Sequence, residues 1–209
     1  MYCPAHFEET RSDVLDELIH ARPLATLITQ TASGLNADLI PLQRVVGGQP
    51  PAMLLGHVAR ANPMWKSART DIEALAIFQG PAAYISPSWY PGKKVDGKAV
   101  PTWNYVVVEA RGKLRFVDDK AWLRAQVEAL TAQQESTFAE PWAVSDAPAD
   151  YVEKMLAAIV GVEMTITSIK GKWKLSQNQP APNRLGAAAG LNGVGSEAAR
   201  AVAALIERP

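Results

Sequence analysis

The sequence predicts a β-barrel with added helices, a fold of the α+β class. Many short strand-like runs are separated by turn residues and interrupted by only a few helices, as in small barrels. Strands and helices do not alternate as they do in βαβ units, which argues against a Rossmann sheet. With 209 residues, we expect one domain over 1–209 that ends in an Ala/Gly-rich helical tail over 183–209.

Caps and turns define the elements in the first half of the chain. Ser12 can cap a helix with one apolar stripe, and Pro23 stops that helix. Turn residues at Ser33-Gly34, Gly47-Gly48 and Gly80-Pro81 separate the strand-like runs. We therefore expect a short helix at Pro63–Thr70 and strands at Ala25–Thr29, Ala37–Val46, Ala52–His57, Ala74–Phe78 and Ala82–Ser86.

Glycines and prolines also divide the second half of the chain. A strand over Thr102–Glu109 leads through Gly112 to another over Lys113–Val117. Further on, Val162–Ile169 and Lys172–Leu175 are expected to pair as a hairpin across Gly171. Helices are expected at Asp119–Gln134, Pro148–Ala157 and Ser196–Glu207.

Composition excludes several classes of protein. Lys+Arg and Asp+Glu both number 21, so the formal net charge is zero and the chain is not generally basic. Because Cys3 is the one cysteine, an intrachain disulfide is impossible and a reducing compartment is expected. The sequence has no run of about 18 apolar residues, so no membrane helix is expected. The N-terminal residues lack the features of a secretory signal, so we expect a cytoplasmic protein without membrane contact.

Several familiar motifs are incomplete in this chain. The stretch from Gly92 to Lys98 has the spacing of a P-loop, but Ala99 stands where a Mg²⁺ ligand is needed. Neither the dinucleotide fingerprint nor a nucleophile elbow occurs. The chain has three histidines, His6, His20 and His57, and no two of them stand at a spacing typical of metal ligands. No metal site is therefore expected.

An anion site is predicted within the stretch Leu54–Lys66. A strand ends near His57, Asn62 is a preferred N-cap residue, and Pro63 suits the first helical position. The free N–H groups of a helix N-terminus attract anions. Arg60 lies just before this helix, and a guanidinium can hold a phosphate through two parallel hydrogen bonds. The pattern describes a phosphomonoester cradle, with an ordinary helix start beside a surface arginine as the alternative.

Three further stretches combine aromatic, polar and basic residues. From Gly80 to Tyr90 and from Val100 to Tyr105, aromatics alternate with hydroxyls and prolines, which suits stacking of a planar ligand or simple packing of a small barrel. Lys172 and Lys174 would share one face of a strand. These lysines either contact nucleic acid together with Trp173 or lie on a solvated hairpin edge.

These stretches resemble the PaiB family, whose members are described as FMN-binding proteins and negative transcriptional regulators. The resemblance covers nearly the whole chain and is densest in the motifs Gly56–Pro63, Tyr84–Tyr90, Val100–Tyr105 and Gly171–Asn178. It implies an FMN-binding split barrel of the flavin-reductase and pyridoxamine-phosphate-oxidase type. Such barrels are typically homodimers with FMN at the subunit interface, so FMN is the implied cofactor.

The resemblance also implies which residues bind the cofactor. The phosphate side comprises His57, Arg60, Asn62 and Trp65. The isoalloxazine would lie along Ile40, Pro41 and Leu42, where backbone groups can meet its polar edge. Trp103 and Asn104 would approach from a neighbouring strand. Residues that would reach the site of the partner subunit are Lys174, Gln177 and Asn178.

The chain departs from the family pattern at three positions. Arg22, Leu39 and Glu109 stand where histidines are common. No acid–base or metal role is therefore carried over to these positions, and catalytic residues stay unassigned. FMN binding through Arg60 and Asn62 is unaffected.

Three functions follow from these observations. The first is a PaiB-like transcriptional regulator, or redox or ligand sensor, that uses flavin at a dimer interface and has DNA as a possible partner. Zero net charge, and a helix with only Lys66 and Arg69 as basic residues, give direct DNA reading little support. The alternative is an FMN-dependent oxidoreductase acting on a small molecule with NAD(P)H. A third is a flavin-storing dimer without turnover.

The chain has six tryptophans, which fall into different classes. Trp122 lies on the apolar side of a predicted helix and is expected in the core. Trp142 receives no role. The four that lie in or beside the family motifs are candidates for a flavin-side cluster: Trp65, Trp89, Trp103 and Trp173.

Overall fold

The structure is a computed structural model that describes residues 1–45 and 52–208. Within these residues, the strands are β1 (Glu8–Glu9), β2 (Leu24–Thr31), β3 (Gly34–Pro41), β4 (Gln43–Val45), β5 (Met53–Ala59), β6 (Glu73–Ile85), β7 (Thr102–Val117) and β8 (Ile159–Lys174). They form one sheet in the order β3-β2-β6-β7-β8-β5-β4, and β1 pairs with β8. The predicted strand end at Val46 and the predicted turn at Gly47-Gly48 lie outside the described residues.

The helices include those predicted and also α3, which the sequence does not predict. They are α1 (Ser12–Ala21), α2 (Met64–Ser67), α3 (Lys93–Asp96), α4 (Lys120–Glu135), α5 (Ala149–Ala157), α6 (Ala181–Val194) and α7 (Glu197–Glu207), with 3-10 turns η1 (Ala5–Phe7), η2 (Pro87–Trp89) and η3 (Val144–Asp146). Ser196 caps α7, because its Oγ accepts from the Ala199 N–H. Asp119 caps α4, because its Oδ1 accepts from the Trp122 N–H. The helices predicted from Ser12, Asp119, Pro148 and Ser196 are therefore present.

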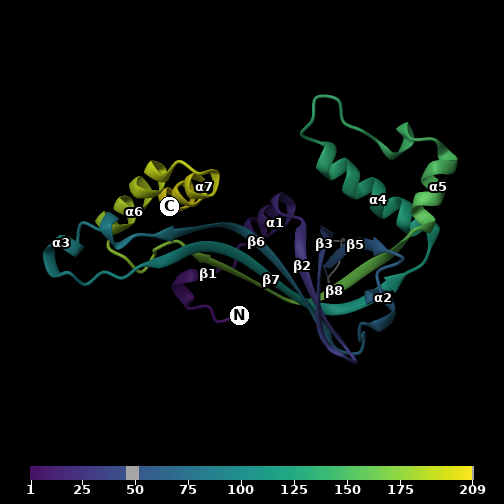
Figure 1. The fold of residues 1–209 in the computed structure, drawn as a ribbon, viewed down its shortest axis with the longest axis horizontal. Coiled ribbons are helices and arrows are strands. Elements are labelled where there is room, and N and C mark those ends of the chain that lie inside the picture. The colour runs from purple at the N-terminus through teal and green to yellow at the C-terminus, as the bar shows by residue number, and fades with distance from the viewer. Residues whose placement is uncertain (46–51, 209) are drawn as a thin grey trace. The chain divides into compact units, whose positions relative to one another are not determined.

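The chain divides into two compact units, and β6, β7 and β8 contribute residues to both (Figure 1). Unit 1 comprises Met1–Leu18, Gln79–Val108 and Lys170–Pro209, and unit 2 comprises Ile19–Phe78 and Glu109–Ile169. The predicted helical tail corresponds to α6 and α7 of unit 1. Neither unit is formed by one continuous stretch of the chain.

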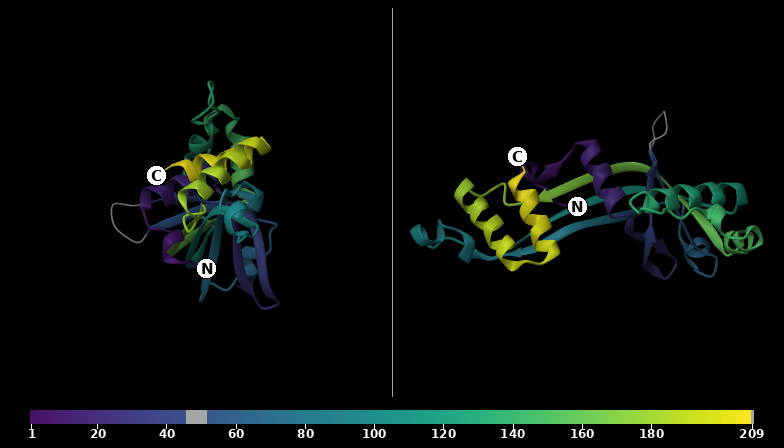
Figure 2. Two further views of the ribbon diagram at one scale, coloured as in Figure 1. Left: turned by 90° about the vertical axis from the view of Figure 1, so that its left-hand side faces the viewer. Right: turned by 90° about the horizontal axis from the view of Figure 1, so that it is seen from above.

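Unit 2 joins a strand layer to a small helical core. β2 and β3 pair antiparallel from Leu24↔Pro41 to Thr31↔Gly34, and β5 pairs with β8 from Met53↔Thr165 to Ala59↔Ile159. Helices α4 and α5 lie beside each other (Figure 2). Their apolar cluster comprises Leu123, Val144, Val152 and Leu156, with Trp122 packed against it. Trp122 thus belongs to a core, as the sequence predicts.

Unit 1 contains the helical pair α6 and α7, which pack side by side (Figure 1). Helix α6 also lies directly on the turn at Trp89. An added Cβ at Gly190 would lie 2.2 Å from Trp89 Cδ2, and one at Gly186 would lie 2.1 Å from the Trp89 carbonyl oxygen. These two glycines permit the contact, because any side chain there would collide with η2.

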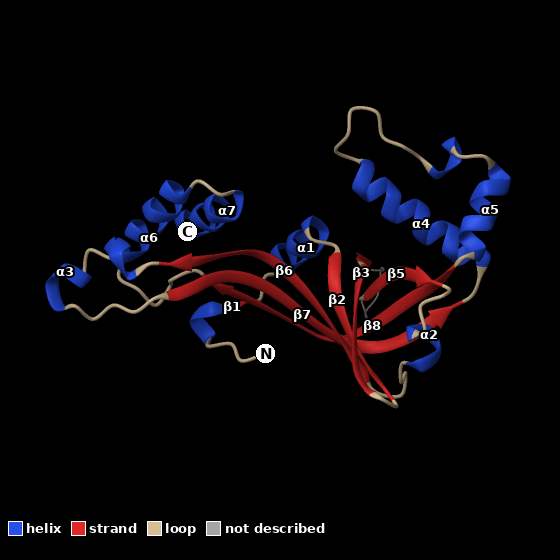
Figure 3. Ribbon diagram, viewed as in Figure 1, coloured by secondary structure: helices blue, strands red, loops and turns tan. Residues whose placement is uncertain are grey.

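Two predicted chain reversals, at Gly80-Pro81 and Gly171, and the predicted break between two strands at Gly112 are wrong, as the uninterrupted strands in Figure 3 show. β6, β7 and β8 are single strands of 13, 16 and 16 residues, where the sequence predicts pairs of shorter strands. Gly80, Gly112 and Gly171 lie inside these strands, and an added Cβ would fall 2.2–2.3 Å from atoms of Val106, Thr165 and Leu15 respectively. The glycines therefore allow close approach instead of making turns. Gly171 pairs with Glu9 of β1, so the predicted hairpin across it does not form.

Candidate functional site

In unit 2, the predicted segment Ile40–Leu42 lies against strand β5. An added Cβ at Gly56 would lie 2.6 Å from the Pro41 carbonyl oxygen and 2.9 Å from Leu42 Cδ2. The side chains of Ile40 and Leu42 are buried, and the Leu42 N–H donates to the Pro23 carbonyl at 2.8 Å. This segment can therefore offer a ligand its backbone around Pro41 rather than its side chains.

His57 follows Gly56 on β5 and is held by helix α4. Its Nδ1 lies 2.8 Å from Oε1 of Gln126. The tautomer of the imidazole decides which of the two groups donates in this hydrogen bond. Gln126 is 4% exposed, and its Nε2 has no hydrogen-bond partner within the described part of the chain. Gln126 Nε2 is thus a buried polar atom beside His57 without a hydrogen-bond partner among the described residues.

The guanidinium of Arg60 is held within unit 2. Nη1 and Nη2 donate to the two carboxylate oxygens of Asp118 at 2.9 and 2.6 Å. Nε and Nη2 donate to the carbonyls of Ala157 and Ile159 at 2.8 and 3.0 Å. Four of the five guanidinium N–H groups are therefore engaged. The hydrogen bond between Arg60 and Asp118 raises the arginine pKa and lowers the aspartate pKa, so each side chain balances the charge of the other.

Asn62 caps the start of α2, as predicted. Its Oδ1 accepts from the Met64 N–H at 2.8 Å, and its Nδ2 donates to Asp38 Oδ1 at 2.9 Å. The helix covers only Met64–Ser67, because the backbone becomes extended at Ala68, so the predicted span of Pro63–Thr70 is too long. A four-residue helix has a weak dipole, and a carboxylate already lies at its start.

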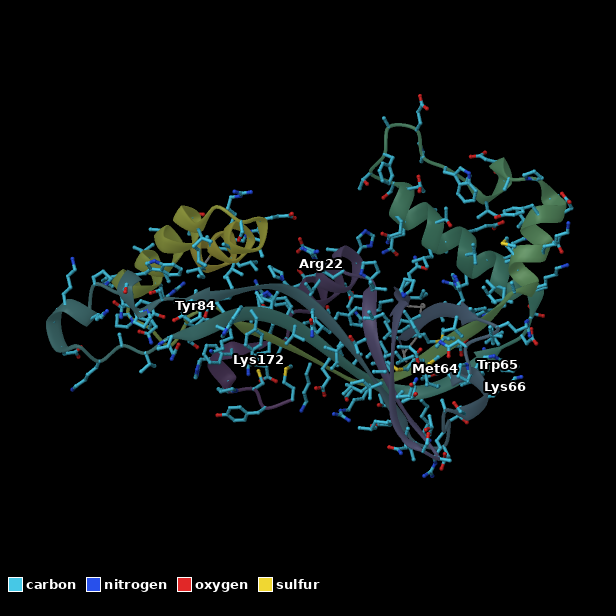
Figure 4. The ribbon with its side chains drawn as sticks, in the orientation of Figure 1. Arg22, Met64, Trp65, Lys66, Tyr84 and Lys172 are labelled. Atoms are coloured by element: carbon cyan, nitrogen blue, oxygen red, sulfur yellow. The ribbon has the colours of Figure 1, made fainter. Side chains whose placement is uncertain are left out.

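Trp65 is fixed between polar and cationic neighbours. Its Nε1 donates to the Arg60 carbonyl at 2.9 Å. The Lys66 ammonium lies 4.8 Å from the centroid of the indole ring, and Arg60 Cζ lies 6.0 Å from it. Figure 4 shows Trp65 and Lys66 side by side at α2. The cations near this ring hold it by cation–π attraction.

In unit 1, three of the four family motifs converge on one pocket of about 180 Å³. The lining residues are Tyr90, Lys98, Ala99, Val100, Pro101, Thr102, Asn104, Lys174, Ser176, Asn178 and Gln179. The pocket thus brings together three of the predicted cofactor-binding residues, namely Asn104, Lys174 and Asn178.

A buried hydrogen-bonded cluster forms part of this pocket. Asn104 is fully buried, and its Nδ2 donates to Ser176 Oγ at 2.9 Å. Burial raises the pKa of Tyr90, and a hydrogen bond with Ser176 opposes that shift. Ser176 has a φ of 64°, a left-handed conformation that non-glycine residues rarely adopt. Such strain persists only where neighbouring contacts hold it, and it is concentrated at functional sites.

Lys174 is anchored at the same pocket. Its Nζ donates to Thr102 Oγ1 and, at 2.8 Å, to the Trp103 carbonyl. Burial lowers the pKa of Lys174, Tyr105 opposes that shift, and the nearby charge of Lys172 adds to it. Partial burial therefore makes the charged form of the ammonium less favourable here than in open water.

The remaining predicted residues of unit 1 have different roles. Trp103 is 56% exposed and meets Tyr84 edge-on, with ring centroids 6.1 Å apart. Gln177 folds back on its own strand: Oε1 accepts from the Leu175 N–H at 2.7 Å, and Nε2 donates to the Trp173 carbonyl. Trp103 is thus available to a planar ligand, whereas Gln177 stabilises the turn after β8.

Sequence reasoning missed the side chains that hold the predicted residues. Asp118 binds Arg60, Gln126 binds His57, and Asp38 binds Asn62. These partners lie outside the motifs and far from them along the chain, so spacing gives no signal for them. Tyr90 and Ser176 do lie in motifs, and the hydroxyls placed at strand ends are the signal that points to them.

The comparison with known families matches residues 1–168 to the family described as "Putative FMN-binding domain". An uncharacterized protein of Emericella nidulans is 33% identical over 241 residues, covering 99% of this chain and 96% of that protein. The protease synthase and sporulation protein PAI 2 of Bacillus subtilis is 29% identical over 179 residues, an alignment that covers 86% of this chain and 83% of that protein. The chain belongs to the PaiB family of FMN-binding domains. The predicted family and its cofactor, FMN, are confirmed.

Solved structures agree with the predicted fold of this PaiB-family chain. The FAD and heme binding protein from Mycobacterium smegmatis has a TM-score of 0.60 at 17% identity, covering 85% of this chain and 78% of that one. The flavocytochrome Anf3 from Azotobacter vinelandii has a TM-score of 0.55 at 12% identity, covering 80% and 69%. The split-barrel fold, an antiparallel sheet with added helices, is therefore confirmed.

The described ranges 1–45 and 52–208 contain neither a candidate membrane span nor a metal-binding cluster. There, no helix has the length and apolar character needed to cross a bilayer. Over the same ranges, no three side chains of His, Cys, Asp or Glu gather in a way that would hold a metal ion.

The residues present fit the parts of a flavin nucleotide. Trp103 and Tyr84 offer exposed aromatic surface to a planar ring. Lys174 offers a cation to a phosphate, and Gln126 Nε2 offers a buried donor to a polar ring edge.

Proposed function

We propose that this FMN-binding domain works as a homodimeric sensor of redox state or of a small ligand, with a regulatory output. The observation that carries the proposal is the division of the predicted cofactor-binding residues into two clusters. The cluster of unit 2, at 40–42 and 57–65, offers backbone groups and an ordered indole. The cluster of unit 1, at 103–104 and 174–178, offers exposed aromatics and a cationic pocket. A flavin at a subunit interface would use one cluster from each copy.

The residues have distinct roles in this proposal. His57, Asn62 and Trp65 would line one side of the cofactor together with the backbone of Ile40–Leu42. Arg60 keeps one N–H outside its bonds to Asp118 and the two carbonyls, so its main role is to position this corner of unit 2. Lys174 and Asn178 would contact the cofactor from the other copy. When bound, FMN supplies hydride or electron transfer.

Mass measurement and spectroscopy test the dimeric site. We expect the purified protein to bind one FMN per chain, to show a flavin absorption spectrum, and to elute as a dimer by light scattering. Added FMN should quench tryptophan fluorescence, because Trp65 and Trp103 lie in the two clusters. A monomer that binds FMN as tightly as a dimer would contradict the interface site.

The pocket of unit 1 favours a second candidate, an oxidoreductase that acts on a small molecule with NAD(P)H. Its volume of about 180 Å³ is enough for a small substrate. The two candidates differ in turnover. NAD(P)H mixed with the FMN-loaded protein without air should bleach the flavin if the protein is such an enzyme, and should leave the spectrum unchanged if it is a sensor without turnover.

DNA is the partner that a regulatory role implies. Helix α2 carries Lys66, and the nearby Arg69 is already paired with Asp71, so this region presents little positive charge. We therefore expect the output to pass through a partner protein or a change of dimer state. Salt-sensitive, sequence-selective binding of the purified protein to promoter fragments would show direct DNA recognition instead.

A further inference from the structure

The pocket of unit 1 has an unbalanced charge. Lys98 and Lys174 line it, and none of its lining residues is an aspartate or a glutamate. The other lining groups are hydroxyls, amides and small apolar side chains. We propose that this pocket is an oxyanion site, which binds the phosphate or carboxylate group of a ligand.

The paired arginines of this protein show by contrast how unusual the surroundings of the Lys174 ammonium are. Several exposed arginines of this protein pair with carboxylates, as Arg115 does with Glu163 at 2.7 Å. Within the described residues, Lys174 has no carboxylate partner; its ammonium donates to a hydroxyl and a carbonyl and lies near the ring of Tyr105. Lys174 is partly buried, and moving a charge out of water is costly unless a group of opposite charge lies near it. An anion in the pocket would supply the missing partner.

Lys172 adds a second positive charge near the ring of Tyr105, which Lys174 also approaches. It is 8% exposed, and its Nζ donates to the Tyr2 carbonyl at 3.0 Å (labelled in Figure 4). The ammonium groups of Lys172 and Lys174 lie 5.4 and 5.9 Å from the centroid of the Tyr105 ring. Glu8 stands opposite Lys172 in the register of β1 and β8, but its side chain is exposed and forms no ion pair with Lys172 among the described residues. The two cations therefore reinforce one another at the pocket.

The hydrogen bonds of Lys174 leave a donor for a ligand. Thr102 and Trp103 use two of the three ammonium N–H groups and fix the position of Nζ. Asn104 and Ser176 are bound to each other, so this wall of the pocket is preorganised. Asn178 lines the pocket and is exposed, where its amide can donate to the same ligand.

The size of the pocket limits what it holds. Pockets that enclose a drug-sized ligand measure roughly 300–1,000 Å³. At about 180 Å³, this pocket suits an anionic group and not a whole flavin. The group has two sources, the terminal phosphate of FMN or a separate small anion. In the first case the inference rests on the proposed function, and in the second it does not.

Titrations of the full chain with inorganic phosphate, FMN and riboflavin test the site. Calorimetry follows phosphate, and flavin fluorescence follows the other two ligands. The variants are Lys174→Met, Lys174→Arg and the matched control Lys113→Met, which removes an exposed lysine of β7 in unit 2. We expect Lys174→Met to weaken phosphate binding about tenfold or more, the effect of losing a charged hydrogen bond. Lys174→Arg and Lys113→Met should bind phosphate nearly as wild type does.

The flavin titrations identify the source of the anion. If Lys174→Met loses the preference for FMN over riboflavin, the pocket holds the cofactor phosphate. If that preference persists while phosphate binding is lost, the pocket holds a separate anion. Equal phosphate affinity in wild type and Lys174→Met, or no phosphate binding together with no preference for FMN, overturns the oxyanion site. A wild type that binds phosphate but no flavin refutes the proposed function and leaves the oxyanion site standing.

Discussion

Replacing Gly190 with alanine would push helix α6 against the indole of Trp89. The new Cβ would lie 2.2, 2.3 and 2.5 Å from three atoms of a rigid ring, Cδ2, Cγ and Cε2, so a small torsion change cannot relieve the clash. Overpacking of this kind costs about 1–3 kcal/mol. Alanine recovers up to about 1 kcal/mol over glycine in a helix, so we expect a net destabilisation of up to about 2 kcal/mol.

The control for this substitution lies in the same helix. Gly193 has nothing within 4 Å of an added Cβ, so Gly193→Ala should be neutral or stabilising by up to about 1 kcal/mol. For a chain of this size, each 1 kcal/mol shifts the melting temperature by about 2–4 °C. Thermal unfolding followed by circular dichroism should therefore place Gly190→Ala several degrees below Gly193→Ala. Equal melting temperatures would refute the argument from close approach.

Three further predictions concern the two clusters. Gly56→Ala would place a Cβ 2.6 Å from the Pro41 carbonyl, so urea unfolding should show a loss of about 1–3 kcal/mol. The lowered pKa of Lys174 means that its folded charge is disfavoured; wild type should gain stability relative to Lys174→Met as pH rises towards 10.5, and a difference that is flat with pH would count against this. Because Arg60 lowers the pKa of Asp118, the advantage of wild type over Asp118→Asn should be present at neutral pH and disappear as pH falls below about 3.8; acid titration of both unfolding transitions checks it.

The class of fold follows from local patterns, whereas the path of the long strands does not. Strand runs, caps and prolines are local, and they correctly indicate a barrel with helices such as α1 and α7. Gly80, Gly112 and Gly171 look like turn residues because glycine serves both turns and close contacts. Only the neighbour across the contact decides between these uses, and that neighbour is far away in the sequence.

The candidate site divides in the same way. The motifs contain Tyr90, Asn104 and Lys174, which line one pocket. The sequence signal for this pocket is that polar and basic side chains stand at the ends of neighbouring strands. The pattern around Arg60 predicts a phosphate cradle, but it cannot show that Asp118 occupies the guanidinium. A charge is available to a ligand only if no other part of the chain neutralises it. For this reason Lys174, which the pattern marks less strongly than Arg60, is the better candidate for binding an anion.

The interleaving of the two units affects how this protein can be made and truncated. During synthesis the ribosome releases every residue of unit 2 before it releases the last segment of unit 1, Lys170–Pro209. The match to the putative FMN-binding domain, residues 1–168, ends at nearly the same point. A nascent chain of that length has the strands around His57 but lacks Lys172, Lys174 and Ser176. The anion pocket is therefore completed only by the final fifth of translation, and truncated chains would lose it first.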